Sequence, residues 1–235
     1  MTRFPSLVSG LPAGNPIRFS GLGIPREPVP DGYYIARLGP STKLPFHDRG
    51  LRRINYEAEI IRPIGNPAPG SQRGRAYGHL YSSRRYAWRD LPPRQWWGPI
   101  ESESTLTRFL KTFGLYQRGM STARRVRAAK ELIESRPVVV VLTMWVAYSR
   151  QQDKTIKCSM SEFPRRADGT HDPYICTEDG EQIRAVAHID GCWPLEWLLD
   201  HGEMDALGRR RFTRSEIEAA YYAAQELSRV QEEVQ

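Results

Sequence analysis

The stretch PVVVVLTMWVAY, from Pro137 to Tyr148, is the strongest strand signal in the chain. Its four consecutive valines favour extended backbone, because β-branched side chains pack well on a pleated surface. The continuous apolar character predicts that both faces of this strand are buried, or that a helix covers one of them. The apolar run is also well short of the roughly 18 residues that a membrane span needs. We therefore expect a central strand of an intracellular, β-rich domain.

Other segments around this strand carry apolar runs or alternating patterns, at residues 33–38, 51–61, 154–163 and 182–189. Residues 51–61 (LRRINYEAEII) alternate strictly, which predicts a half-buried strand with Tyr56 on one face and Arg53 on the other. Residues 154–163 (KTIKCSMSEF) also alternate, and we expect them to pair with the valine-rich strand across a turn at residues 151–153.

Residues 73–88, RGRAYGHLYSSRRYAW, mix basic and aromatic side chains without an acid. The alternation places Arg75, Tyr77, His79 and Tyr81 on one face of a strand and small or apolar residues on the other. Arginine binds phosphate and aromatic rings stack on bases, so a groove that follows a single nucleic-acid strand uses both. The alternative is an edge strand whose solvated face is polar and aromatic, and this segment alone supports both interpretations.

Two helices are predicted between this segment and the valine-rich strand. Residues 101–113 have apolar side chains at helical spacing, with Ser102 or Ser104 as a cap and Gly114 at the end. Residues 121–134 form the second helix, with arginines 124, 125 and 127 near its beginning. Positive charge there interacts unfavourably with the helix dipole, and an anionic partner would relieve this repulsion. The alternative interpretation is that these arginines lie on a solvated helix face.

Charge and composition divide the chain into three parts. Residues 1–30 are rich in proline and glycine and are expected to form an extended arm. Residues 190–235 hold 5 basic and 10 acidic residues, whereas residues 1–189 hold 29 and 17. We expect a basic domain at residues 31–189 and an acidic helical extension at residues 190–235. In the extension, Trp193 and Trp197 belong to an apolar segment, and Thr213 with Glu216 fits a capping box.

Sequence motifs for metal or catalytic chemistry are weak. The three cysteines argue against a disulfide framework, and with His171 and His188 they lack zinc-ligand spacing. Acids at 168–181 lie among turn-forming residues, where acids are common. Glu57, Glu59 and Lys157 are the combination that a metal-dependent nuclease needs, but such triplets are common by chance. We predict no catalytic residue, no cofactor and no metal.

The order of elements is strand, strand, long loop, strand, helix, strand, strand. This order suits a mainly β fold with α: a five-stranded OB-type Greek-key barrel with a helix between strands three and four. Five segments also resemble the single-stranded-DNA-binding proteins of tailed phages and prophages, which are OB-folds: DGYYIARL (31–38), LRRINYEAEII (51–61), RGRAYGHLYSS (73–83), STLTRFLKTFGL (104–115) and RPVVVVLTMWVAYSRQQDKTIKCSMSEFPR (136–165). The basic segment 119–136 and the long C-terminal extension depart from that family.

The resemblance implies that strands two and three carry DNA and that the hairpin of strands four and five lines the groove. The residues it nominates on the first surface are Arg53, Tyr56, Arg75, Tyr77, His79, Tyr81, Arg84, Arg85, Tyr86 and Trp88. Those it nominates on the hairpin are Trp145, Tyr148, Arg150, Lys154 and Lys157.

The implied role is non-catalytic binding and protection of single-stranded DNA in replication, recombination or repair, in the cytoplasm of a bacterial or phage-infected cell. The ligand can also be RNA. The protein can also form a homo-oligomer, or bind a replication or recombination partner through its C-terminal helix. Two alternatives stay open. One is a metal-dependent nucleic-acid enzyme or accessory subunit that uses the loop acids, and the other is a viral structural protein that contacts packaged DNA.

Overall fold

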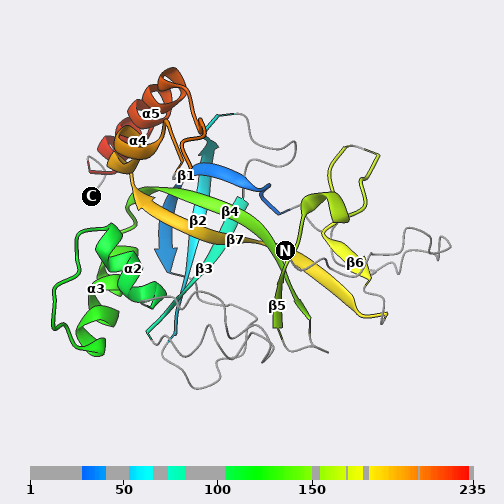
Figure 1. Cartoon of the computed structure of the whole chain (residues 1–235), viewed down its shortest axis with the longest axis horizontal. Coiled ribbons are helices and arrows are strands. Elements are labelled where there is room, and N and C mark those ends of the chain that lie inside the picture. The colour runs from blue at the N-terminus through cyan, green and yellow to red at the C-terminus, as the bar shows by residue number, and fades with distance from the viewer. Residues whose placement is uncertain are drawn as a thin grey trace.

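The computed structural model describes residues 28–40, 53–65, 74–82, 104–149, 154–167, 169–176, 180–205 and 207–232. Most of the expected N-terminal arm therefore lies outside the described residues. The elements, in chain order, are β1 (Gly32–Pro40), β2 (Arg53–Pro63), β3 (Gly74–Tyr81), α2 (Thr105–Thr112), α3 (Thr122–Glu134), β4 (Val138–Ser149), β5 (Lys154–Lys157), the 3-10 helix η2 (Met160–Glu162), β6 (Tyr174–Cys176), β7 (Gln182–Pro194), α4 (Glu196–His201) and α5 (Arg214–Glu232) (Figure 1).

Five of these strands close into a barrel in the order β1-β2-β3-β7-β4. Neighbouring strands run antiparallel, except that β3 and β7 are parallel and pair at Tyr77 and His188. Helices α2 and α3 lie between the third and fourth barrel strands in the sequence. The predicted five-stranded barrel of the OB type, with helix between strands three and four, is thereby confirmed.

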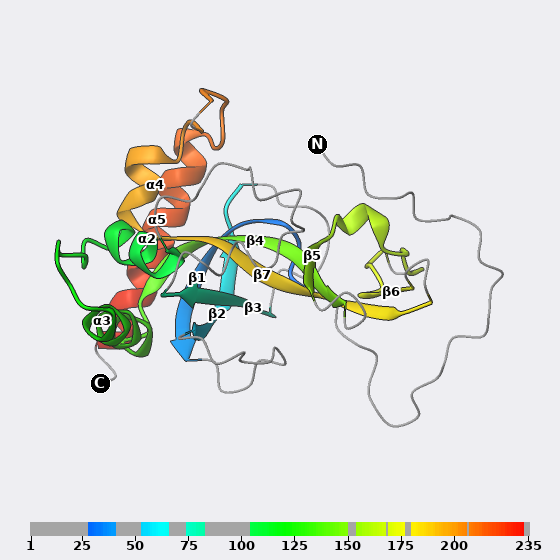
Figure 2. The same cartoon turned by 60° about the horizontal axis from the view of Figure 1, so that its bottom comes forward.

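The last strand of the barrel is not the one that the sequence predicted. Only Lys154–Lys157 of the expected strand 154–163 forms a strand, and this short β5 pairs with the end of β4. The side chains of Ser159 and Glu162 then form a capping box that begins η2 and ends the strand pattern. Strand β7 closes the barrel instead, and it pairs with β4 from Val139 to Ala147. Beyond the barrel, β4 and β7 continue as a ribbon that carries β5 and β6 (Figure 2).

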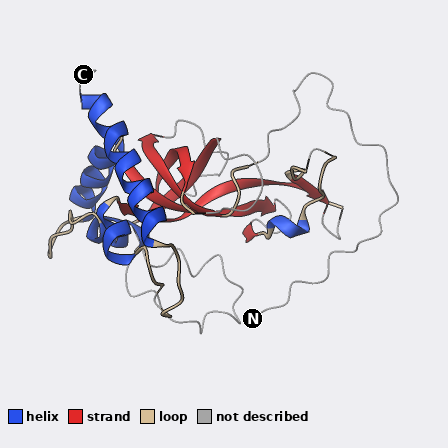
Figure 3. Ribbon diagram, turned by 90° about the horizontal axis from the view of Figure 1, so that it is seen from above, coloured by secondary structure: helices blue, strands red, loops and turns tan. Residues whose placement is uncertain are grey.

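Both faces of the valine-rich strand are buried, as predicted. Val139 and Val141 belong to the barrel core, whereas Val138 and Val140 pack beneath the C-terminal helices. Each fully buried valine contributes about 1.5–3 kcal/mol relative to exposure. Strand β7 continues through residue 190 to Pro194 and leads directly into α4. The C-terminal extension is thus a cover for the outer face of β1 and β4. Figure 3 shows the helix that ends at the C-terminus lying beside one end of the strands.

Helix α2 has the cap and the end that its sequence predicts, and α3 begins with a cap at Ser121. The hydroxyl of Ser104 accepts from the N–H of Thr107 at 3.2 Å, and that of Ser121 accepts from Arg124 at 3.3 Å. Gly114 has a φ of +68°, and the N–H of Leu115 donates back to the carbonyl of Leu110 at 2.8 Å. Within the described residues, no helix is both long enough and apolar enough to cross a membrane.

The residues just before β1 are part of the domain. Val29 is buried, and its carbonyl accepts from the indole N–H of Trp145 at 2.9 Å. The carbonyl of Pro30 accepts from the hydroxyl of Thr143 at 2.7 Å. The expected arm therefore joins the barrel at residues 28–30, earlier than the boundary placed at residue 31.

Candidate nucleic-acid interface

The outer face of β3 carries the row of side chains that the sequence predicted. Burial alternates along the strand, with Ala76, Gly78 and Leu80 turned into the barrel. Tyr77, His79 and Tyr81 are half-buried on the opposite face, and Arg75 at the start of the strand is exposed. The alternation puts three rings at every second position of one strand, where they face away from the core.

Strand β2 supplies polar neighbours to this row. The register places Asn55 opposite His79 and Glu57 opposite Tyr77. A hydrogen bond of 3.1 Å joins Nδ1 of His79 and Oδ1 of Asn55, which orients the imidazole ring. Arg75 pairs with Glu57 at 3.2 Å. Because exposed ion pairs are typically worth about 0–1 kcal/mol, a phosphate can compete for this guanidinium.

Tyr56 does not belong to the interface. Its ring lies inside the barrel beneath Gly78, and a Cβ atom at Gly78 would come within 2.4 Å of that ring. Burial raises the pKa of its hydroxyl well above the ordinary value. Because Tyr56 is only 3% exposed, it cannot stack on a base. The prediction that Tyr56 contacts nucleic acid is therefore wrong, and its ring supports β3 from inside the barrel.

Trp145 is also a core residue. It is fully buried, and its ring meets Phe163 edge-on at a centroid distance of 5.0 Å and His171 at 5.9 Å. Trp145 and Phe163 form part of a small hydrophobic cluster beneath the β4–β7 ribbon. The indole N–H already donates to the carbonyl of Val29, so Trp145 is not available to line a groove. Its position near the end of an apolar strand could not distinguish these two roles.

The structure describes only some of the other residues that were predicted to bind nucleic acid. Arg84, Arg85, Tyr86, Trp88 and Arg150 lie outside the described residues. The register puts Arg53 opposite Tyr81, at the same end of the β2–β3 pair. The backbone of three others, Tyr148, Lys154 and Lys157, belongs to the β4–β5 hairpin. The structure thus brings together the β3 row and Arg53, and places the hairpin residues on the ribbon.

A pocket opens next to this row, between β3 and β7. The two strands pair at Tyr77 and His188, and α2 packs across the opening beyond that point. The pocket has a volume of about 430 Å³. Its lining residues are Tyr56, His79, Leu80, Tyr81, Thr105, Arg108, Phe109, Thr112, His188, Ile189, Asp190, Gly191, Cys192 and Trp193.

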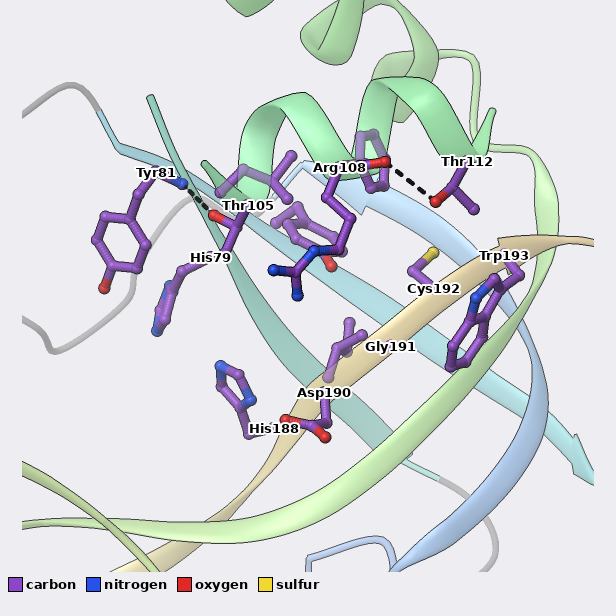
Figure 4. Close-up of a pocket in the computed structure, with 14 residues that line it drawn as sticks. His79, Tyr81, Thr105, Arg108, Thr112, His188, Asp190, Gly191, Cys192 and Trp193 are labelled. Atoms are coloured by element: carbon purple, nitrogen blue, oxygen red, sulfur yellow. Dashed lines mark hydrogen bonds between the residues drawn. The ribbon is translucent and has the colours of Figure 1, made fainter. Parts of the chain in front are cut away.

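Side chains from three elements converge on this pocket, as Figure 4 shows. Arg108 extends from α2 toward its middle, and His79 faces His188 from the opposite strand, with 5.4 Å between ring centroids. The hydroxyl oxygen of Thr105 accepts from the N–H of Tyr81 at 2.7 Å, which ties α2 to the end of β3. Trp193 stands at the far end of the pocket.

A β-bulge shapes the β7 side of the pocket. Leu142 pairs with Gly191 and Thr143 pairs with Ile189, so Asp190 is the extra residue. A bulge reverses which residues face inward, because alternation resumes one position later. Ile189 therefore points into the barrel core before the bulge, and Cys192 packs against the same core after it. Burial raises the pKa of the Cys192 thiol, so it stays protonated at neutral pH and is a poor nucleophile.

The pocket residues on α2 and β7 were not predicted from the sequence. Thr105, Arg108 and Thr112 have the spacing of one helix face, so their shared direction was readable. The contribution of β7 to the pocket could not be predicted from the sequence, because it depends on which strand closes the barrel and on the bulge. Within the described ranges, no group of three or more His, Cys, Asp or Glu residues is arranged to hold a metal ion.

Basic side chains continue from the pocket onto α3. Four of them, Arg118, Arg124, Arg127 and Lys130, are exposed. Arg125 differs, because its guanidinium donates to the hydroxyl oxygens of Thr107 at 2.7 Å and Thr122 at 3.1 Å. One of the three arginines predicted near the start of this helix thus ties α3 to α2, and the other two face outward.

No protein-family model, curated protein or solved structure matches the chain.

Proposed function

We propose that this chain binds single-stranded DNA with little sequence preference and protects it during replication, recombination or repair. The observation that carries the proposal is the row of Tyr77, His79 and Tyr81 on the outer face of a barrel strand. Stacking of a base on an aromatic side chain is worth about 1–3 kcal/mol and tolerates any sequence, because every base has a π-face. The function is binding, and no catalytic step is assigned to it.

The spacing of the row favours a single strand over a duplex. Alternate side chains on a β-strand recur about every 6.6 Å, whereas stacked bases along one strand of B-DNA are about 3.4 Å apart. Bases can meet consecutive rings only if the strand is stretched, or if intervening bases turn away. A duplex keeps its bases stacked and paired, and so cannot engage the row in this way.

The charge distribution supports a polyanionic ligand. Residues 104–130 contain no acid and seven lysines or arginines, and they form α2, the connection to α3 and the part of α3 before Glu131. Arg108 from this segment lines the pocket beside the row. Phosphates attracted to this basic surface would release counterions, which gives binding a steep dependence on salt. The face of strands two and three is also where barrels of the OB type bind oligonucleotides.

The proposal is tested by fluorescence anisotropy with labelled oligo(dT) and with a duplex of equal length, at low and moderate salt. We expect tighter binding of the single strand, which weakens as salt rises. Tyr77→Ala and Tyr81→Ala should each weaken it by about 1–3 kcal/mol. Tyr222→Ala is the matched control, because Tyr222 is 64% exposed on α5, away from β3.

Circular dichroism would establish that each variant is folded. Equal affinity for the single strand and the duplex would contradict the proposal. So would a loss in the Tyr222 variant as large as the loss in the β3 variants.

A further inference from the structure

The pocket between β3 and β7 shares two side chains with the stacking row. His79 and Tyr81 belong to the row and also line the pocket. We propose that the pocket receives one nucleotide of the bound strand, with its base inserted between β3 and β7 and its phosphate beside Arg108. This inference rests on the proposed function, and adds to it a defined site for a single nucleotide.

The size and the interior of the pocket suit a flat aromatic group. Its volume of about 430 Å³ falls within the range of roughly 300–1,000 Å³ that is usual for small-molecule sites. The rings of Tyr56 and Phe109 lie in its wall with a centroid distance of 5.9 Å, and both belong to the barrel core. Trp193 adds a third ring at the far end. Tyr56 and Phe109 pack on each other and are too buried to stack on a base, so they form the apolar floor of the pocket. A base that leaves the stack of its strand would rest against this floor, beside the ring of Trp193.

The polar groups lie where the sugar-phosphate and the edge of a base would need them. Arg108 is exposed on α2 and reaches toward the middle of the pocket, where its guanidinium can bind a phosphate by two parallel hydrogen bonds. His188 lies across the pocket from Arg108 on β7, with Asp190 next to it in the lining, and the two supply hydrogen-bonding groups for a base edge. An apolar interior with a few converging polar groups is the usual design of a ligand site.

Local structure keeps the pocket open. The side-chain hydroxyl of Thr112 donates to the carbonyl of Arg108 at 3.0 Å, and Thr105 is bonded to the end of β3, so the helical wall is fixed. Gly191 lets the ring of Trp193 fold over β7, since a Cβ atom there would lie within 2.0 Å of that ring. The opening is therefore part of the fold, and a base can enter it without unfolding an element.

The test uses dGMP as the probe and the folded, full chain. Binding is followed by NMR through the indole N–H signal of Trp193, assigned with Trp193→Phe. We expect dGMP to shift this signal and deoxyribose 5-phosphate, which has no base, to bind at least roughly tenfold more weakly. Arg108→Gln should weaken dGMP binding roughly tenfold. Arg229→Gln, which removes an exposed arginine from α5, should leave it unchanged.

Oligo(dT) binding, measured on the same samples, separates this inference from the proposed function. If oligo(dT) binds but dGMP leaves the Trp193 signal unmoved, the nucleotide pocket is refuted and strand binding stands. Equal binding of deoxyribose 5-phosphate, or no effect of Arg108→Gln, would refute the pocket as well. If dGMP binds as expected but oligo(dT) does not, the pocket is a site for free nucleotides and the proposed function is refuted. Failure of both probes refutes both.

Discussion

Replacing Gly78 by alanine tests how the barrel core positions the stacking row. A Cβ atom at Gly78 would lie 2.4 Å from the ring of Tyr56, far inside van der Waals contact. That ring is 3% exposed and packed in the core, so it cannot swing aside without displacing its neighbours. Overpacking of this kind costs about 1–3 kcal/mol. For a chain of this size, each kcal/mol lowers the melting temperature by about 2–4 °C.

The chain offers a matched control for this change. Gly39 lies on β1, and a Cβ atom there would meet nothing within 4 Å. Gly39→Ala should therefore be neutral, or stabilising by up to about 1 kcal/mol through the reduced entropy of the unfolded chain. Both variants would be compared with the parent by urea unfolding and by thermal circular dichroism.

A second substitution shows whether the clash is the cause. Tyr56→Leu shortens the side chain beneath Gly78 and so removes the atoms that an alanine would meet. The double variant Gly78→Ala/Tyr56→Leu should then be less destabilised than the sum of the two single variants, as expected for residues in contact. Additive losses would refute the reasoning, and so would a Gly78→Ala variant as stable as Gly39→Ala.

Two further predictions concern the rest of the fold. Burial raises the pKa of the Asp31 carboxyl group, although the N–H of Trp145 donates to it at 2.8 Å. Its protonated form therefore contributes stability that is present below the ordinary pKa of about 3.9 and lost as pH rises through the raised value. Asp31→Asn keeps an acceptor oxygen but carries no charge. The stability of this variant, measured relative to the parent by urea unfolding, should therefore improve from strongly acidic to neutral pH. A difference in urea midpoints that does not change with pH would contradict this prediction. Ile217→Ala should cost about 2–5 kcal/mol in urea unfolding, because Ile217 is 3% exposed between α5 and the barrel, and a loss below about 0.5 kcal/mol would show that α5 is only a surface appendage.

Local features of the fold were readable from the sequence because neighbouring residues determine them. The alternation of Tyr77, His79 and Tyr81 follows from the two-residue period of a strand. The cap at Ser104 satisfies a backbone N–H group within the same turn of helix, and Gly114 adopts a positive φ that favours glycine. The capping box of Thr213 and Glu216 also forms as predicted, with the N–H of Thr213 donating to the Glu216 carboxylate at 2.7 Å.

Features that depend on distant partners were predicted less well. Residues 154–163 and 182–194 both adjoin the valine-rich strand, and alternation does not say which of them returns to β3 to close the barrel. For the same reason, Tyr56 and Trp145 were nominated for the interface although both are in the core. An aromatic side chain on a strand suits a binding face and an interior equally well, so its role depends on which face the fold covers.

The types of most elements, the caps at Ser104 and Thr213 and the row on β3 follow from the spacing of side chains along the chain. The pocket does not, since its walls come from α2, β3 and β7, which are far apart in the sequence. Its shape depends on a parallel pairing at Tyr77 and His188 and on a bulge at Asp190 that turns Cys192 toward the core. Such features arise only when the strands close on one another, because closure selects the register and the register selects which side chains meet.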